Sequence, residues 1–465
     1  MAHLRKILTI LGYVLLTLIV ALVTVLLVAY GQGYVYDFKA GKLIHNGLVM
    51  LQSSPSGAEV SLAGKDLNKK TDYRQLYAPG KYTFELNKPG YQPWKKTVEV
   101  VAGEASMAQY AILTPNSPKT TVLDEQTAIL AQSMTKDNNH LAYVVGGDQA
   151  GVYVLDIGGS AKKVFVNPAP EKDKPVETLE SVRWSADGSH LLVVSRTDSG
   201  RVYRVMSNGG ADVLNLTDQY RFDFPGLVFS QNNWKKLYWL SGGDLRRLDL
   251  DAKTVSGVLV DKVTQINPLG DKLLYVRSDT TGYSLWSLDS NDKGQSVIPA
   301  LTPSAAYSLA YVSWRNHDEL AVVPTASRTG MLYSDAFGST PSSMTIAQGV
   351  DRASFSPDGH LLTFYGGNLA VTYDLDQSDY LKKRVSYTLP GISGLHELTW
   401  FDNFHIVLNE GGRIVWAEFD GTNAHDLGAA YAEFPAYGSS DNRSVIGVFD
   451  HGVGRAQVTE MLLKP

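Results

Sequence analysis

The chain has 465 residues, of which 44% are hydrophobic and 19% charged, so it is not globally disordered and is too long for one ordinary core. The absence of cysteine excludes disulfides, thiolate metal sites and a cysteine nucleophile. The net charge is −5, and the residues beyond 113 carry 30 Lys/Arg against 40 Asp/Glu. This negative balance disfavours nucleic acid as a partner, because the phosphate backbone attracts basic surfaces.

The first predicted element is a transmembrane helix over residues 7–30, which contain no charge. A helix of this length spans roughly 36 Å, enough to cross a hydrocarbon core of about 30 Å. Residues 1–6 contain Arg5 and Lys6, so the positive-inside bias leaves the N-terminus in the cytoplasm and places the bulk of the chain on the extracytoplasmic side of a cell membrane. The alternatives are the reverse orientation and a cleaved signal peptide, which has a shorter apolar core and a small-residue cleavage site.

Residues 31–46 are predicted to form an extended connector, and residues 47–114 a compact β module. In the module, short alternating runs are separated by Pro- and Gly-containing turns, which is typical of a small β-sandwich. One face of this sandwich is expected to bury the following apolar residues: Val49, Leu51, Val60, Leu62, Tyr82, Phe84, Val98 and Val100.

The turn residues of this module resemble those of the PEGA domain, a small β-sandwich of bacterial and archaeal surface proteins. The resemblance is carried, in chain order, by Ser54-Pro55-Ser56-Gly57-Ala58-x-Val60, Leu76, Pro79-Gly80-x-Tyr82, Gly90-Tyr91, Val98-x-Val100 and Gly103. It implies a surface or spacer role without catalytic residues. Ser56 stands where the family usually has an acid.

Residues 115–120 are predicted to be a short linker, and residues 121–465 a β-propeller. One pattern recurs eight times between Met134 and Glu460: a polar turn, a hydrophobic run, a gap and a second run that ends near an acid. The closing runs end about 43 residues apart, a period typical of four-stranded propeller blades. The predicted fold class is therefore all-β, with a PEGA-like sandwich and an eight-bladed, or alternatively seven-bladed, propeller after one transmembrane helix.

The clearest copies of the turn are Trp184-Ser185-Ala186-Asp187-Gly188 and Phe355-Ser356-Pro357-Asp358-Gly359. They resemble the TolB-like or WD-type propeller repeats, in which this turn joins the first two strands of a blade. Residues 120–123 are expected to add an outer strand to the last blade and so close the ring.

No catalytic, cofactor or metal motif stands out in the sequence. It has no Gly-x-Ser-x-Gly elbow, no His-Glu-x-x-His and no phosphate-binding or dinucleotide glycine loop. The closest approach to a calcium loop is Asp374-x-Asp376-x-x-Asp379, which lacks the ligand spacing of such loops. The expectation is a non-enzymatic protein without cofactor, whose turn acids accept local backbone hydrogen bonds.

Ligand contact in propellers usually falls on the loops around the central channel, so residues there are the candidates for recognition. Arg221 and Phe222 belong to a turn rich in aromatic residues, and Arg328 belongs to another loop. These three are the candidate ligand-face residues, and packing between blades is the competing interpretation.

The sequence therefore predicts a membrane-anchored, non-catalytic binding or scaffold protein that presents a propeller to a cell-envelope polymer or a partner protein. The alternatives are an envelope hydrolase or lyase that uses carboxylates in the channel, and a purely structural subunit of an envelope complex.

Overall fold

In the computed structural model the chain forms two compact units, residues 1–118 with 463–465 and residues 119–462. The structure describes residues 2–31, 33–37, 41–167, 176–289, 291–450, 452 and 455–464. Each unit is considered by itself below. We call them the N-terminal unit and the repeat unit.

The N-terminal unit begins with helix α1 (Ala2–Gly31). Its segment Ile10–Gly31 is long and apolar enough to cross a membrane, and its side chains are exposed along the whole length. The apolar helix predicted from the sequence is therefore present.

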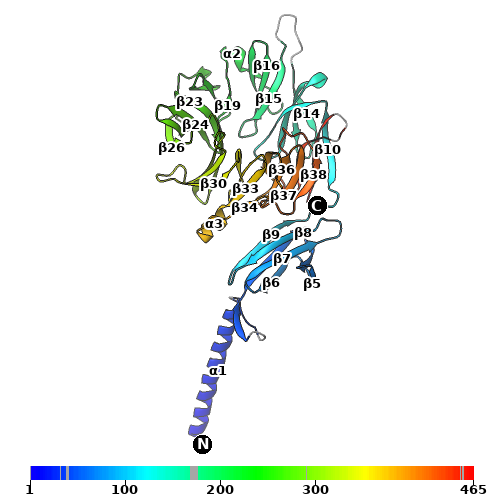
Figure 1. Ribbon diagram of the computed structural model, residues 1–465, viewed down its shortest axis with the longest axis vertical. Coiled ribbons are helices and arrows are strands. Elements are labelled where there is room, and N and C mark those ends of the chain that lie inside the picture. The colour runs from blue at the N-terminus through cyan, green and yellow to red at the C-terminus, as the bar shows by residue number, and fades with distance from the viewer. Residues whose placement is uncertain are drawn as a thin grey trace. The chain divides into compact units, whose positions relative to one another are not determined.

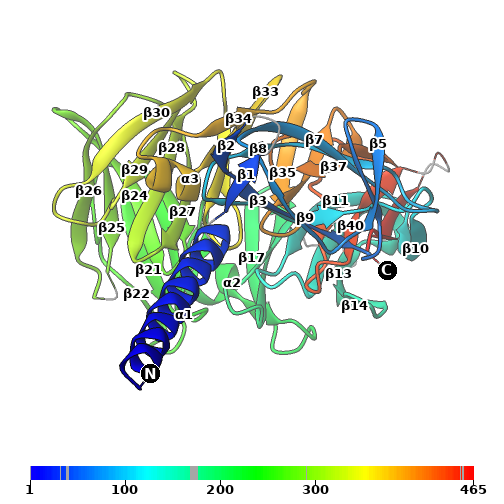
Figure 2. The same ribbon diagram turned by 90° about the horizontal axis from the view of Figure 1, so that it is seen from below.

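A β-hairpin follows the helix where the sequence predicts an extended connector. Its strands β1 (Tyr34–Asp37) and β2 (Lys42–His45) pair antiparallel. Figure 2 shows both strands next to the C-terminal end of α1. The two strands have only four residues each and do not alternate strictly between apolar and polar residues, so the sequence does not predict them.

The module after the hairpin is a sandwich of two sheets. One sheet has the order β6-β3-β9 and the other β5-β4-β7-β8. Strands β3 and β9 run parallel, and the remaining pairs are antiparallel. The strands are β3 (Gly47–Ser54), β4 (Glu59–Leu62), β5 (Lys65–Lys70), β6 (Tyr73–Tyr77), β7 (Gly80–Asn87), β8 (Trp94–Val100) and β9 (Ala105–Ile112).

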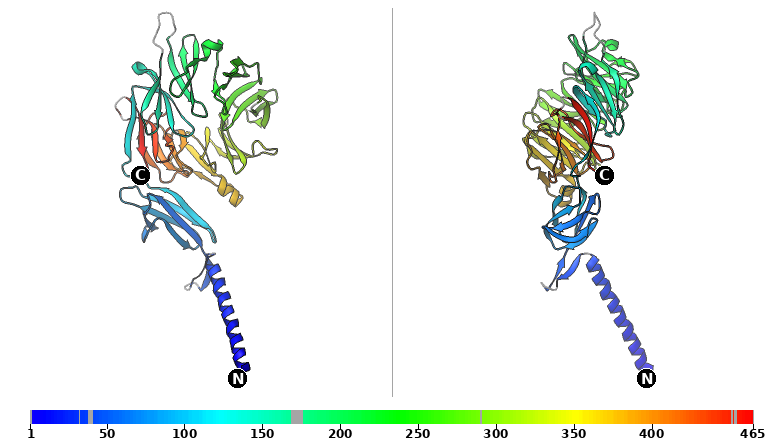
Figure 3. Two further views of the ribbon diagram at one scale, coloured as in Figure 1. Left: turned by 180° about the vertical axis from the view of Figure 1, so that it is seen from behind. Right: turned by 90° about the vertical axis from the view of Figure 1, so that its right-hand side faces the viewer.

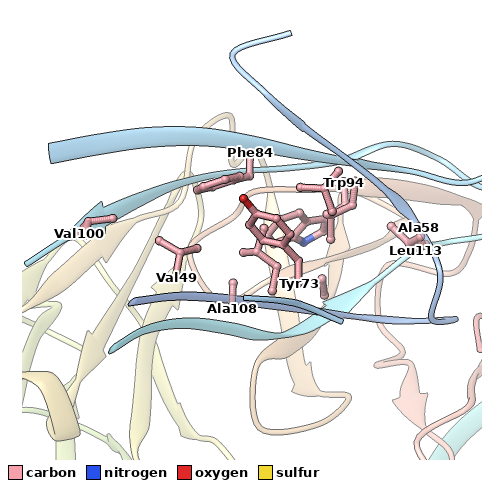
Figure 4. Packing of buried hydrophobic residues seen from close by; sticks show 12 residues of the cluster. Val49, Ala58, Tyr73, Phe84, Trp94, Val100, Ala108 and Leu113 are labelled. Atoms are coloured by element: carbon pink, nitrogen blue, oxygen red, sulfur yellow. The ribbon is translucent and has the colours of Figure 1, made fainter. Parts of the chain in front are cut away.

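Five of the eight core residues that the sequence predicts are fully buried between the two sheets: Val49, Leu51, Val60, Phe84 and Val100. The other three, Leu62, Tyr82 and Val98, pack against it partly buried. Trp94 and Tyr73 fill the centre, as Figure 4 shows, although the alternation does not single them out.

The described residues of the repeat unit form eight four-stranded antiparallel sheets, arranged around a ring in Figures 1 and 3. In seven of them four consecutive strands pair in chain order. The first four are β11 (Ile129–Met134), β12 (His140–Val145), β13 (Gly151–Asp156), β14 (Ala161–Val166); β15 (Thr178–Trp184), β16 (His190–Thr197), β17 (Gly200–Ser207), β18 (Leu214–Asn215); β19 (Val228–Phe229), β20 (Lys236–Ser241), β21 (Asp244–Asp249), β22 (Thr254–Val255); and β23 (Val263–Leu269), β24 (Lys272–Asp279), β25 (Gly282–Leu288), β26 (Gly294–Leu301).

The next three sheets follow the same order. They are β27 (Tyr307–Trp314), β28 (His317–Pro324), β29 (Thr329–Ser334), β30 (Ser342–Gln348); β31 (Arg352–Phe355), β32 (Leu361–Gly366), β33 (Leu369–Asp374), β34 (Ser386–Thr388); and β35 (Leu395–Trp400), β36 (His405–Glu410), β37 (Arg413–Glu418), β38 (His425–Ala429). Three short helices lie in the connections: η1 (Gly147–Gln149), α2 (Leu216–Tyr220) and α3 (Leu375–Leu381).

The last sheet joins the two ends of the repeat unit. Its strands β39 (Tyr437–Gly438), β40 (Ser444–Asp450) and β41 (Ala456–Leu462) are completed by β10 (Lys119–Gln126), which pairs antiparallel with β41. Residues 120–123 thus supply an outer strand to this sheet, as the sequence predicts. The sheet also packs against the first one, since Ile446 and Val458 share a buried cluster with Leu141 and Tyr143.

The sequence repeat and the sheets coincide. All eight closing runs lie in or at the end of third strands, and all eight polar turns lie between first and second strands. The hydrophobic run of each unit forms a second strand, whose consecutive middle residues are buried on both faces of the sheet.

Candidate functional site

The two ends of the sheets carry different kinds of connection. Because the strands alternate in direction, the first-to-second and third-to-fourth connections lie at one end, and the second-to-third and between-sheet connections at the other. We call the first end the turn face and the second the loop face. Arg221, Phe222 and Arg328, the candidates from the sequence, all lie in connections of the loop face.

Arg221 and Phe222 project from a loop that is fixed by a buried neighbour. Helix α2 is capped by the side chain of Asn215, which accepts from the amide of Asp218, and it ends at Arg221 in the left-handed conformation (φ 53°). Phe224 is fully buried and meets Trp239 edge to face at 5.0 Å. Phe222 remains 45% exposed, with one side against Phe224 and Trp239.

Arg328 has a different role, because its guanidinium is occupied within the chain. Its Nε and Nη2 donate to the two carboxylate oxygens of Asp351 at 2.7 and 3.0 Å, and Nη2 also donates to the carbonyl of Gly349. A bidentate pair of this kind ties the loop after β28 to the connection before β31. The geometry favours the packing interpretation for Arg328 and leaves Arg221 and Phe222 as the exposed pair.

Carboxylates near the start of the first strands are also paired with arginines. Glu180 on β15 accepts from Arg201 Nε at 2.7 Å and from Arg196 Nη2 at 2.5 Å. Arg352 donates to Glu397 on the neighbouring sheet. Arg201 and Arg196 hold the pKa of Glu180 at about 2, far below its usual 4.5.

The Glu180 cluster was not among the residues singled out by the sequence, although a signal exists. Arg196 and Arg201 flank the short turn between β16 and β17 and stand directly opposite each other in the strand register. Like charges in that position repel and need a counter-ion. An acid on the adjacent strand is therefore expected.

Replacing Glu180 with glutamine is expected to make the free energy of unfolding less dependent on pH in the acid range. Because the folded-state pKa is depressed, the carboxylate stabilises the fold above the unfolded pKa of about 4.5, and this contribution is lost as the pH falls towards 2. Solvent screening limits the contribution to under about 1 kcal/mol. Denaturant midpoints of wild type and Glu180→Gln, measured across this pH range, should converge at the acid end; a constant difference at all pH values would contradict the assignment.

The turn face is built from repeated Ser/Asp turns. In one, the hydroxyl of Ser185 donates to Asp187 and accepts from the amide of His190. The turns that begin at Ser356 and Ser439 have the same bonds. These acids satisfy local donors, as the sequence predicts. A polar hollow of about 660 Å³ lies between two neighbouring turns and includes Asp137 and Asp187.

The three acids that approach a calcium spacing are engaged within the chain. Asp374 caps α3 by accepting from the amide of Gln377. Asp376 and Asp379 share Arg315, and Asp379 also pairs with Lys382. Within the described part of the chain, no group of three or more acidic or histidine side chains is placed to hold a metal ion.

Comparison with known families identifies the module of the N-terminal unit. Residues 46–113 match the PEGA domain family. The match covers both sheets of the sandwich and confirms the resemblance carried by its turn residues. We refer to this sandwich as the PEGA module.

The chain matches no curated protein sequence, and several solved structures resemble it. One is the Dos1 propeller, with 14% identity over 74% of this chain and 94% of that one and a TM-score of 0.49. Another is the C-terminal WD40 domain of Sif2, with 10% identity over 74% and 98% and a TM-score of 0.47. Kluyveromyces lactis Hsv2 has 10% identity over 63% and 93% and a TM-score of 0.44.

Proposed function

We propose that this protein is a non-catalytic, membrane-anchored bacterial scaffold whose eight sheets form the blades of one closed propeller. Helix α1 is the anchor, with the N-terminus in the cytoplasm, and the PEGA module and propeller lie outside the membrane. The propeller presents its loop face to a polymer of the cell envelope or to a protein partner.

The observation that carries this proposal is the exposed Arg221–Phe222 pair on a fixed support. Phe224 and Trp239 hold the loop from beneath. On this support the ring of Phe222 is exposed, and so is the neighbouring Arg221, whose guanidinium has no hydrogen-bond partner among the described residues. Aromatic residues and arginine are enriched among residues that dominate binding energy, and a preorganised loop loses little entropy on binding.

The pairing of carboxylates supports binding over the hydrolase or lyase alternative. Acid–base catalysis on a glycoside needs one carboxyl with a raised pKa beside a second carboxylate. Glu180, Glu397 and Asp351 are each engaged by arginine, and the arginines beside Glu180 lower the pKa of that carboxyl. Burial raises the pKa of Glu319 and Asp374, which are 4% and 7% exposed, and of Glu410, which is partly exposed at the end of β36.

A binding experiment with matched variants tests the recognition surface. Full-length protein in nanodiscs is screened against purified peptidoglycan, teichoic polymers and solubilised envelope proteins, and the affinity for any retained component is then measured. Replacing both Arg221 and Phe222 with alanine is expected to weaken binding about tenfold or more, or about 1.4 kcal/mol. Tyr380→Ala, which removes an exposed aromatic ring from α3 on the turn face, is the control and should leave the affinity unchanged.

Two outcomes would overturn the proposal. Equal weakening by the Tyr380 variant would place recognition elsewhere, and turnover of a wall substrate that is abolished by Glu410→Gln would favour an enzyme. Topology is tested separately: protease added to intact cells with a permeable outer layer should digest the propeller, and digestion only after lysis would reverse the orientation.

A further inference from the structure

The hairpin β1–β2 lies beside the last turns of the membrane helix. A cavity of about 410 Å³ is lined by residues from both: Val23, Leu26, Leu27, Ala29, Tyr30, Tyr34, Val35, Tyr36 and Leu43. Figure 3 shows the hairpin beginning beside the C-terminal end of α1 and then diverging from the helix. The space between the hairpin and the last turns of the helix is the cavity.

The depth of this contact follows from helix geometry. Val23 lies eight residues before the helix ends at Gly31, a distance of about 12 Å along the axis. The cavity that the hairpin shares with Val23 and Leu26 therefore extends below the end of the apolar span. If the span crosses a bilayer, this level belongs to the headgroup region and the upper acyl chains.

The chemistry of the hairpin suits that level. Tyr36 and Leu43 stand opposite each other in the strand register, so their side chains share one face of the hairpin. They are 49% and 60% exposed, and the cavity lining contains no charged residue. A leucine exposed to water costs about 1.5–3 kcal/mol relative to burial, whereas tyrosine is favoured at the membrane interface.

The hairpin is also firmly joined to its neighbours on both sides. The amide of Gly33 donates to the Tyr30 carbonyl at 3.0 Å, and the amide of Asn46 donates to the Gly33 carbonyl at 2.7 Å. Gly33 has φ +88°, and a Cβ there would lie 2.5 Å from the Asn46 carbonyl oxygen, so the position requires glycine. The Asn46 carbonyl in turn accepts from the amide of Gly103 in the PEGA module.

We propose that the β1–β2 hairpin is a second membrane-contacting element, inserted into the outer interface with its Tyr36–Leu43 face towards lipid. A lipid acyl chain occupies the cavity between the hairpin and α1. The occupant is lipid because the cavity continues the exposed apolar surface of α1, whose residues from Ile10 to Tyr30 require the same environment. This inference rests on the proposed anchoring.

Site-directed spin labelling tests the proposal directly, because the chain has no cysteine of its own. Leu43→Cys is labelled with a nitroxide in the full chain and reconstituted into phosphatidylcholine–phosphatidylglycerol vesicles. The measured quantity is the ratio of collisions with oxygen to collisions with a water-soluble nickel chelate. We expect this ratio to be several-fold higher for the label at Leu43→Cys than for a label at Val213→Cys, an exposed apolar position of the repeat unit. Tyr36→Cys should give the same result.

Ile19→Cys, in the middle of α1, separates the two proposals. A lipid-buried label at Ile19 with a water-exposed label at Leu43 would overturn the hairpin proposal and leave the anchor intact. Water exposure at both positions would overturn the anchor itself. A Leu43 label shielded from both oxygen and nickel would show that protein, such as a second copy, covers the hairpin, and would also overturn the lipid assignment.

Discussion

Replacing Phe224 with alanine is expected to lower the free energy of unfolding by about 3–5 kcal/mol. The ring is fully buried and meets both Tyr203 and Trp239 edge to face, so truncation leaves a cavity between two neighbouring sheets. Unfolding of the full-length protein by guanidinium, followed by near-UV circular dichroism in detergent, measures the loss.

Phe222→Ala is the matched control for this prediction. Its ring is about half exposed and belongs to the same loop, so its removal should cost under about 1 kcal/mol. The two variants thus separate support from recognition: the Phe224 change lowers stability, and the Phe222 change lowers affinity for the partner. Equal destabilisation by both would show that Phe222 belongs to the core, and would remove it from the proposed binding surface.

Introducing a methyl group at Gly330 is expected to destabilise the protein by about 1–3 kcal/mol. Gly330 lies on β29, and a Cβ there would meet the ring of Phe364 on β32 at 2.5 Å, closer than side chains approach in folded proteins. Its φ does not lie in the left-handed region, so the cost is one of packing between two sheets rather than of backbone strain. Denaturant unfolding of Gly330→Ala measures it.

A second substitution tests the cause of this effect. Phe364→Leu vacates the space of the ring. The double variant should therefore lose about 1 kcal/mol less free energy of unfolding than the sum of the losses in the two single variants. Gly209→Ala is the control, since nothing lies within 4 Å of its added methyl group. Strict additivity of the Gly330 and Phe364 changes would show that the strain arises elsewhere.

Much of the repeat unit follows from local signals. Polar turns, short hydrophobic runs and strand-ending acids recur at a period that matches one four-stranded sheet, and each signal acts within about ten residues. Even the closing pair of β10 and β41 can be predicted, because a ring of hairpin-connected sheets leaves one outer position open. The PEGA module is predictable for a similar reason, since its turns require particular glycines and prolines.

The site is only partly predictable, because the environment of a loop side chain depends on distant residues. Arg221, Phe222 and Arg328 look alike in the sequence as residues of loops with aromatic or basic character. The structure separates them: Asp351 engages Arg328, while Phe222 lies above a buried ring and stays exposed.

The sequence by itself determined the apolar helix, the PEGA module and the repeated sheets, because each depends on the spacing of apolar, turn and glycine residues along a short stretch of chain. Only the tertiary structure decided which carboxylates meet arginines and which aromatic rings support the loop of Arg221 and Phe222. It also showed that the segment after the helix shares a cavity with Val23 and Leu26. These contacts join residues far apart along the chain or on different elements, and their energy depends on distances that spacing does not encode.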